Sequence, residues 1–295
     1  MRHGMGIIVS KPQGRLQVVA TPIGNMADVS DRLRQALAGA DAVAAEDTRR
    51  TLALLSSLGL SRPLISLHEH NEARRVPDLV GRLQAGETIA LVSDAGTPLL
   101  SDPGFELLRG AIAAGIPVEP IPGPSALTAA LSVAGVPVRR FCFEGFLPPR
   151  ESERRAQLAR LAAETRTLVF FEAPHRIAAT LAELAAQFGG DREAAVAREL
   201  TKSHETVYRG TLASLARRAA EEENFRRGEL TLVVAGAPAA PDQVDTVLLR
   251  RAVELLSREI APGRAAALAA QLTGATRQEA YALLPREPKP PGGQD

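Results

Sequence analysis

The sequence has few aromatic residues, one cysteine and no metal-binding motif. Aromatic side chains make up 3% of the 295 residues and tryptophan is absent, so a broad aromatic platform for stacking bases is not expected. The single Cys142 excludes an internal disulfide and any site that needs several cysteines. Because Phe141 and Phe143 flank it, we expect a buried core thiol, and such cysteine usage fits a reducing cytoplasm. His68 and His70 have no obvious third partner, so no metal is expected.

Neither sign of charge dominates the chain. Lys plus Arg total 35 and Asp plus Glu total 34, which gives a net charge of +1. A uniformly basic coat for binding nucleic acid is therefore excluded, although a local basic face is not. The sequence shows neither the pattern of a signal peptide nor a run of about 20 apolar residues. We therefore expect a cytoplasmic protein without a membrane partner.

Short apolar runs alternate with amphipathic stretches, a pattern typical of β-α-β units. A first α/β domain with a mostly parallel sheet is expected over residues 15–135, and a second over residues 136–238. The predicted strands 193–199 and 205–209 are too close for a helix to join them, so the second sheet should contain an antiparallel pair and be mixed. Three short helices predict a small helical domain over residues 242–284. Residues 1–14 and 285–295 are expected to be flexible tails.

Four loops rich in glycine, proline or acidic residues each follow a predicted strand of the first domain. They span residues 21–25, 46–49, 93–104 and 122–126. Ligands of open α/β sheets bind outside the carboxyl ends of the strands, where glycine and proline form tight turns that let the backbone approach a ligand. Asp47, Asp94 and Asp102 lie in these loops and could hold an ammonium group or a ribose, or serve as turn and capping residues. None of the loops carries a dinucleotide fingerprint or a P-loop.

Several long segments occur in an order that points to a known family. They are VVATPIGN (18–25), AAEDTRRT (44–51), SLHEHNE (66–72), LVSDAGTPLLSDPG (91–104), PIPGPSA (120–126), FFEAPHRI (170–177), ARELTKSHETVYRGTL (197–212) and GELTLVVAG (228–236). This order resembles the tetrapyrrole methylase superfamily of S-adenosylmethionine-dependent methyltransferases. Within it, the sequence is most similar to the ribosomal RNA small subunit methyltransferase I family. The resemblance covers about residues 16–237 and extends more weakly to Tyr281.

The resemblance implies an α/β fold in which two domains of the tetrapyrrole methylase type hold S-adenosylmethionine in the cleft between them, with a small C-terminal helical domain and a homodimer as the usual assembly. The residues carried over to the cofactor site are Pro22, Gly24, Asp94, Gly96, Thr97, Pro98, Ser101, Ser125, Ala126, Phe171, Glu172, Leu200, Glu229, Leu230 and Thr231.

The implied reaction is methylation of a cytidine ribose 2′-hydroxyl in the decoding region of 16S ribosomal RNA. Two alternatives stay open: a methyltransferase that acts on a tetrapyrrole, and a non-catalytic RNA-binding assembly factor. Thr97 stands where tetrapyrrole methylases of the superfamily usually carry aspartate, which weakens the first alternative. We expect the small ribosomal subunit or its RNA as partner, and no DNA.

A ribose hydroxyl reacts poorly until its proton leaves, so a general base is expected. Glu46 and Asp47 are the favoured candidates, with Arg49 as a clamp for a phosphate or carboxylate. Lys202 and His204 are the second choice.

RNA contact needs local positive charge, because phosphates dominate affinity. The best candidates flank the predicted substrate side of the cleft and are Arg139, Arg140, Arg150, Arg154 and Arg155. The C-terminal helices are a second candidate surface for RNA or the ribosomal subunit.

Overall fold

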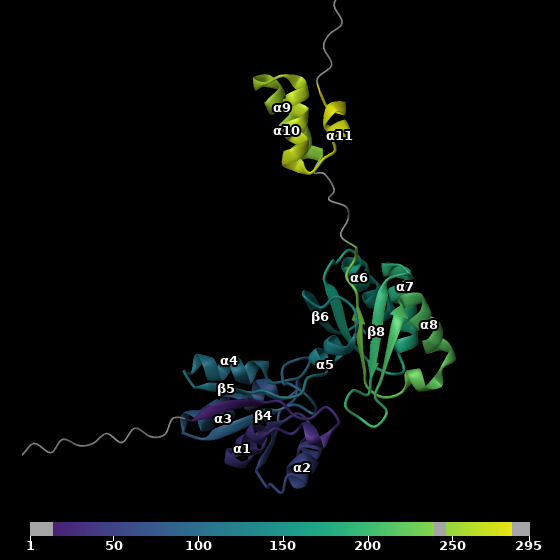
Figure 1. The fold of residues 1–295 in the computed structure, drawn as a ribbon. Helices are drawn as coiled ribbons and strands as arrows, with labels where there is room; N and C mark the ends of the chain where they lie inside the picture. The colour runs from purple at the N-terminus through teal and green to yellow at the C-terminus, as the bar shows by residue number, and fades with distance from the viewer. Residues whose placement is uncertain (1–13, 239–245, 285–295) are drawn as a thin grey trace, which may run out of the picture. The chain divides into compact units, whose positions relative to one another are not determined.

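The computed structural model describes residues 14–238 and 246–284, and these fall into two compact units that divide after Ala237. The first unit contains two separate five-stranded sheets with their helices, and the second contains three helices (Figure 1). The tails expected at residues 1–14 and 285–295 lie outside the described part, apart from Gly14.

The first sheet consists of five parallel strands in the order β3-β2-β4-β1-β5. Their bounds are Arg15–Val19 (β1), Ala42–Ala45 (β2), Leu64–Ser66 (β3), Thr88–Val92 (β4) and Val118–Ile121 (β5). Every residue of β2 is buried, as expected for a parallel sheet that helices cover on both faces. The carboxyl ends of all five strands therefore meet at one edge, and the four loops singled out in the sequence leave from it.

Helices pack on both faces of this first sheet. They are α1 (Asp31–Gly39), α2 (Thr48–Ser57), α3 (Glu72–Gln84) and α4 (Phe105–Ala113). Leu37 of α1 and Leu55 of α2 are buried in one hydrophobic cluster. Leu83 of α3 and Leu107 of α4 are buried in a second cluster, which contains different residues of the strands. The Ser30 hydroxyl accepts the N–H of Leu33 at 3.1 Å and so caps α1.

The second sheet is mixed, with the order β6-β7-β10-β8-β9. Its strands are Phe141–Phe146 (β6), Thr167–Glu172 (β7), Glu193–Arg198 (β8), Thr206–Thr211 (β9) and Leu230–Val234 (β10). Only β6 and β7 are parallel among these pairs of described strands. The expected antiparallel pairing of the strands at 193–199 and 205–209 is confirmed, because β8 and β9 pair from Glu193 opposite Thr211 to Arg198 opposite Thr206.

Helices α6 (Glu151–Leu161), α7 (Ile177–Phe188) and α8 (Leu212–Glu221) share one core with this second sheet. A further helix, α5 (Ala126–Val133), was not expected from the sequence. Leu127 and Leu131 of α5 pack with Val169 of β7 and Val233 of β10 in a separate cluster. Because α5 begins directly after the fourth loop, it joins the carboxyl edge of the first sheet to the second sheet.

The second unit is a small helical body with its own core. It contains α9 (Thr246–Glu259), α10 (Pro262–Thr273) and α11 (Arg277–Ala282). Leu249 and Val253 of α9 are buried with alanines of α10 and α11. A capping box starts α11, because Thr276 and Glu279 each accept a hydrogen bond from the other's backbone N–H. No helix in the described part of the chain is long and apolar enough to cross a membrane.

Candidate functional site

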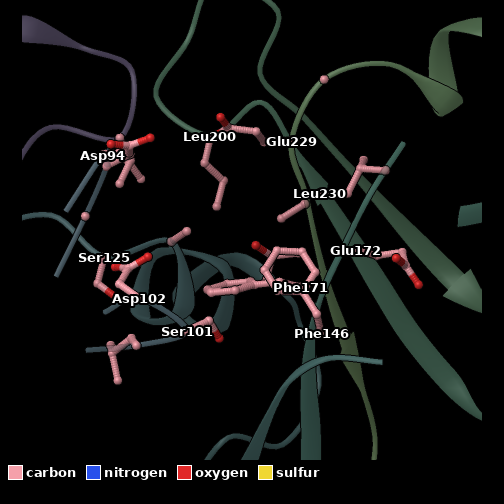
Figure 2. Close-up of a pocket in the computed structure, with 18 of the residues that line it drawn as sticks. Asp94, Ser101, Asp102, Ser125, Phe146, Phe171, Glu172, Leu200, Glu229 and Leu230 are labelled. Atoms are coloured by element: carbon pink, nitrogen blue, oxygen red, sulfur yellow. The ribbon is translucent and has the colours of Figure 1, made fainter. Parts of the chain in front are cut away.

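A cavity of about 420 Å³ lies between the two sheets of the first unit (Figure 2). Its size is within the range of sites for small molecules and cofactors. Most residues expected at the cofactor site line it: Asp94, Gly96, Thr97, Ser101, Ser125, Ala126, Phe171, Glu172, Leu200, Glu229, Leu230 and Thr231. Pro22, Gly24 and Pro98 do not belong to its lining, although all three lie in loops that border it.

Backbone hydrogen bonds tie the loops of the first sheet to one another. Thr21 and Gly96 form an isolated antiparallel bridge, with N···O distances of 2.8 and 3.1 Å. The hydroxyl of Thr97 donates to a carbonyl oxygen of the fourth loop at 3.2 Å. The N–H of Asp47 donates to a carboxylate oxygen of Asp94 at 3.0 Å. The third loop is therefore bound to the other three, which gives this wall of the cavity a defined shape.

Two loops that border the cavity hold non-glycine residues with positive φ. Leu99 (76°) and Ser101 (69°) belong to the third loop, whereas Glu199 (50°) and Thr201 (66°) follow β8. Such conformations cost about 1–3 kcal/mol each and persist only where the surrounding structure holds them. Strain on both sides of one cavity is typical of a functional site.

The second sheet supplies an apolar wall. The ring of Phe171 lies 4.9 Å from that of Phe143 and 5.6 Å from that of Phe146, measured between centroids. Figure 2 shows Phe171 and Phe146 on one side of the cavity, with Asp94 and Ser125 on the other. The cavity therefore offers one apolar aromatic face and one face rich in carboxylates and backbone amides.

The acidic face has unusual electrostatics. Burial raises the pKa of Asp102 to about 6, and the neighbouring Asp94 adds to this shift against a hydrogen bond from Ser93. The pKa of Glu46, at the end of β2, is also raised, first by burial and then by the charges of Asp94 and Asp102. Arg50 offsets part of this negative charge, because its guanidinium lies 3.4 Å from Asp94. The pocket therefore favours a positively charged ligand.

The carboxylates contributed by the second sheet are bound to partners. Glu172 is buried, and it accepts hydrogen bonds from the Thr180 hydroxyl at 2.5 Å and from the N–H of Ala173 at 2.8 Å, with Arg176 at 3.2 Å. Glu229 forms an ion pair with Lys202 at 3.1 Å. The first carboxylate is thus fixed toward α7, and the second sits at the rim.

Lys202 is held as a cation. Its Nζ lies 2.9 Å from Glu199 and 3.1 Å from Glu229. Burial lowers the pKa of Lys202, but the two carboxylates outweigh this effect and raise it above the usual value. Lys202 is therefore a poor proton acceptor, contrary to its expected role, and instead links the loop after β8 to β10. His204 is exposed, and its carbonyl oxygen accepts a hydrogen bond from Arg198 at 2.8 Å.

Asp47 and Arg49 interact with each other rather than with the cavity. Asp47 caps α2 by accepting the N–H of Arg49 at 2.9 Å, and it pairs with the Arg49 guanidinium at 2.7 Å. Hydrogen bonds from Arg49 lower the pKa of Asp47 to about 2, which argues against its taking up a proton. The Arg49 side chain is 90% exposed, whereas the neighbouring Arg50 lines the cavity. Glu46 lies near the acidic face but does not line it.

The arginines expected to bind RNA divide into two groups. Arg139 and Arg140 are exposed before β6, and Arg150 and Arg155 are exposed but paired with glutamates of α6. The prediction for Arg154 is wrong, because its side chain is only 8% exposed and binds both oxygens of Glu183 at 2.6 and 2.8 Å. That ion pair attaches α6 to α7 and leaves no free guanidinium for a phosphate.

Several lining residues were not assigned to the site from the sequence. They are Ile23, Arg50, Ala95, Leu100, Asp102, Phe146, Ala173, Pro174, Ala197 and Gly228. Asp102 was expected either to hold an ammonium group or a ribose or to be a turn or capping residue, and Arg49 was considered in place of the adjacent Arg50. Phe146 follows a break in the register between β6 and β7 at Phe143 and Gly145, where Gly145 has a φ of 65°. Simple alternation along β6 does not reveal such an irregularity.

Residues 15–216 match the model of a family described as Tetrapyrrole (Corrin/Porphyrin) Methylases. The chain is 53% identical over 268 residues to Ribosomal RNA small subunit methyltransferase I of Xylella fastidiosa (strain Temecula1), covering 91% of this chain and 98% of that protein. The protein of the same name from Pseudomonas aeruginosa is 48% identical, with 91% and 95% covered. That from Escherichia coli O157:H7 is 45% identical, with 91% and 94% covered.

Solved structures share the fold at low sequence identity. Uroporphyrin-III C-methyl transferase from Thermus thermophilus, complexed with S-adenyl homocysteine, has a TM-score of 0.53 and 18% identity over 75% of this chain and 97% of that chain. The methyltransferase CobJ has a TM-score of 0.55 and 18% identity over 77% and 95%. A diphthine synthase has a TM-score of 0.55 and 17% identity over 75% and 90%. At these identities the likeness shows the fold alone.

Proposed function

Because the chain belongs to the tetrapyrrole methylase family, and within it to the family of ribosomal RNA small subunit methyltransferase I, we propose that it methylates the RNA of the small ribosomal subunit with S-adenosylmethionine as cofactor. The acceptor that we propose is the ribose 2′-hydroxyl of a cytidine in the decoding region of 16S ribosomal RNA, in line with the resemblance of the sequence segments. The observation that carries the proposal is a cavity that is apolar on one face and acidic on the other, in a chain 53% identical to a relative of that name.

The residues of the cavity fit S-adenosylmethionine. This cofactor combines an aromatic base, a ribose, an ammonium group and a positively charged sulfonium. Phe171 and Leu230 provide apolar surface for the base, and Asp94 provides a carboxylate for a hydroxyl or an ammonium group. The raised pKa values of Asp102 and Glu46 report a surplus of negative charge, which suits a cationic ligand. A related structure with S-adenyl homocysteine has the same fold.

The protein's own work in such a reaction is to position the reactants and to handle one proton. When bound, the cofactor supplies an activated methyl carbon. Holding two reactants in line can contribute about 7–11 kcal/mol to lowering the barrier. Asp94 is itself fixed by the N–H of Asp47 and by Arg50, so this part of the wall is preorganised. Phe171 and Leu200 line the cavity with apolar surface.

The proposed RNA contacts lie outside this cavity. Arg139 and Arg140 are exposed beside β6, and Arg50 extends from the cavity wall with 64% of its side chain exposed. Arg50, rather than Arg49, is therefore the residue that we assign to a substrate phosphate next to the reaction centre. Because the net charge is only +1, the affinity for bare RNA should fall with salt less steeply than that of a highly basic protein.

We also propose a homodimer, as the family resemblance implies. Phe105 and Ile112 lie one above the other on α4 and are 56% and 61% exposed. Two large apolar side chains on the outer face of one helix are a surface that a second copy of the chain would cover. Light scattering of the Ile112→Glu variant, beside the wild type, tests this assignment.

One assay separates the proposal from its alternatives. Calorimetry measures the binding of S-adenosylmethionine, and labelled methyl transfer is then followed with small ribosomal subunits and with protein-free 16S RNA. Nucleoside mass spectrometry is expected to show 2′-O-methylcytidine. Methyl transfer to a porphyrinoid instead would favour a tetrapyrrole methylase, and RNA binding without cofactor binding would favour an assembly factor.

A matched pair of variants links the activity to the cavity. Phe171→Ala should weaken cofactor binding by about tenfold, because it removes the central apolar ring of the wall. Leu52→Ala, at an exposed position of α2 outside the cavity, should leave cofactor binding unchanged. Equal effects of the two changes would contradict the assignment of the cavity.

A further inference from the structure

The carboxylates that line the cavity differ in whether they are free to accept a proton. Glu172 is bound to Thr180, to Arg176 and to a backbone N–H. Asp94 accepts a backbone N–H and faces Arg50, and Glu229 pairs with Lys202. A carboxylate that pairs with a cation is a weak base, because the cation stabilises its ionised form. These three carboxylates are therefore suited to structure and binding.

Asp102 is the exception. Within the described residues it forms no ion pair, and it lies on the strained third loop directly after Ser101, whose φ is 69°. Figure 2 shows Asp102 on the same side of the cavity as Asp94 and Ser125, across from Phe171. It is half-buried and lines the cavity, so it can meet a ligand bound there.

The charges around Asp102 favour proton uptake. Burial is the largest cause that raises its pKa to about 6, and Asp94 adds to it, whereas Ser93 donates a hydrogen bond that opposes the shift. Glu46 contributes a further nearby negative charge, and the cation Arg50 lies 3.4 Å from Asp94 in this group of carboxylates. A base with a pKa just below the working pH is ionised and still accepts a proton readily.

We propose that Asp102 is the general base of the methyl transfer. The inference rests on the proposed function. Asp102 takes the proton of the substrate hydroxyl as the hydroxyl oxygen bonds to the methyl carbon in place of sulfur, which keeps the electron pair of the broken bond. The protonated Asp102 then releases its proton to solvent when the product leaves. Asp102 thus takes the role first expected of Glu46 or Asp47.

The first test compares Asp102→Asn with the wild type under single-turnover conditions at saturating cofactor and small subunit. Asparagine has nearly the same shape but cannot accept the proton, so the rate should fall about 10²–10⁴-fold. Cofactor affinity, measured separately by calorimetry, should fall far less than the rate, because Asp102 is one of several carboxylates that line the cavity, whereas the base acts on the substrate. Asp78→Asn, on the exposed face of α3, is the matched control and should leave both quantities unchanged.

The second test is the pH profile. The wild-type rate should rise with pH as Asp102 ionises and then level off, because only ionised Asp102 accepts a proton. With the cationic cofactor bound, the inflection should lie at or below the pKa of about 6 of the ligand-free group, because a nearby cation stabilises the ionised form. This inflection should be missing in Asp102→Asn. It should be present in Asp102→Glu, which keeps a carboxylate, although the rate of that variant should be lower than that of the wild type. Carbon-13 NMR of labelled aspartate reads the same titration near pH 6 in the enzyme alone, without turnover.

Three outcomes would overturn the proposal: a rate for Asp102→Asn within about threefold of the wild type, an inflection that persists in that variant, or a loss of cofactor affinity that accounts for the loss of rate. Asp102→Glu and the NMR titration decide the matter if Asp102→Asn fails to fold. A wild-type protein that transfers no methyl group to the small subunit would instead refute the proposed function, so the two failures are distinguishable.

Discussion

Lys202 packs against Gly24 so closely that a Cβ atom at position 24 would lie 2.3 Å from Lys202 Cγ. Gly24 belongs to the loop after β1, and Lys202 belongs to the loop after β8, so this contact joins the two sheets beside the cavity. Gly24 also has a φ of 152°, which side chains rarely adopt. The pairs of Lys202 with Glu199 and Glu229 hold the side chain in place. The contact therefore requires glycine at position 24 on two independent grounds.

Gly24→Ala should destabilise the first unit. The positive φ alone costs about 1–2 kcal/mol, and displacement of Lys202 should add about 1–3 kcal/mol to the loss in the free energy of unfolding. Gly59→Ala is the matched control, because Gly59 has a φ of 68° but nothing within 4 Å of its added Cβ. Urea unfolding measures both. Equal losses for the two variants would show that Lys202 moves aside freely.

Arg154→Ala should destabilise the protein much more than Arg155→Ala. Removing Arg154 leaves Glu183, whose side chain is 13% exposed, without its cation, which costs up to about 3–5 kcal/mol, whereas the exposed pair of Arg155 with Glu151 contributes about 0.2–1 kcal/mol. Urea unfolding of the two variants checks the order. If Arg154→Ala lowered RNA affinity at unchanged stability, its assignment to structure would be wrong.

Asp102→Asn should raise stability above pH 6. The folded pKa of about 6 lies above the ordinary value of 3.8, so folding penalises the charged form, and the wild type loses stability as pH rises from about 4 to 6. Asparagine removes this penalty, which is worth roughly 1–3 kcal/mol for a half-buried group. Urea unfolding at pH 4 and pH 8 should show a gain for the variant only at pH 8. A gain of the same size at both values would mean that Asp102 titrates normally.

Deletion of residues 242–295 should weaken substrate binding and leave cofactor binding intact. The second unit has its own core and carries Arg250, Arg251, Arg264 and Arg277 on its surface, and none of the residues that line the cavity belongs to it, so its removal should take away positive charge that can bind phosphates. Binding of the small subunit should fall by about tenfold, and its dependence on salt should become shallower. Unchanged subunit binding would rule out a role for these helices.

Local patterns predicted the elements well because their signals lie close together in the chain. The strands expected at residues 193–199 and 205–209 are β8 (Glu193–Arg198) and β9 (Thr206–Thr211). The three short helices expected within residues 242–284 are α9, α10 and α11. Helix α5 escaped prediction because it is short, its apolar residues face the second sheet, and its first residue, Ala126, forms part of a loop motif.

Side-chain roles in the candidate site depend on partners that are distant in the chain. Asp47 and Asp102 are both aspartates in loops after parallel strands, and the sequence alone treats them alike. In the fold, Arg49 pairs with Asp47 and lowers its pKa, whereas burial and the neighbouring Asp94 raise the pKa of Asp102. Arg154 was mistaken for a surface residue because its partner Glu183 lies 29 positions away on another helix.

The residues with positive φ have a consequence for protein engineering. Leu99, Ser101, Glu199 and Thr201 each hold a conformation that glycine adopts freely, so replacement by glycine or asparagine relieves strain. A library selected only for heat tolerance would therefore enrich changes in the two loops that shape the cavity. Thermostable variants of this chain should be screened for ligand binding at every round, because substitutions that relieve this backbone strain can also change the shape of the cavity.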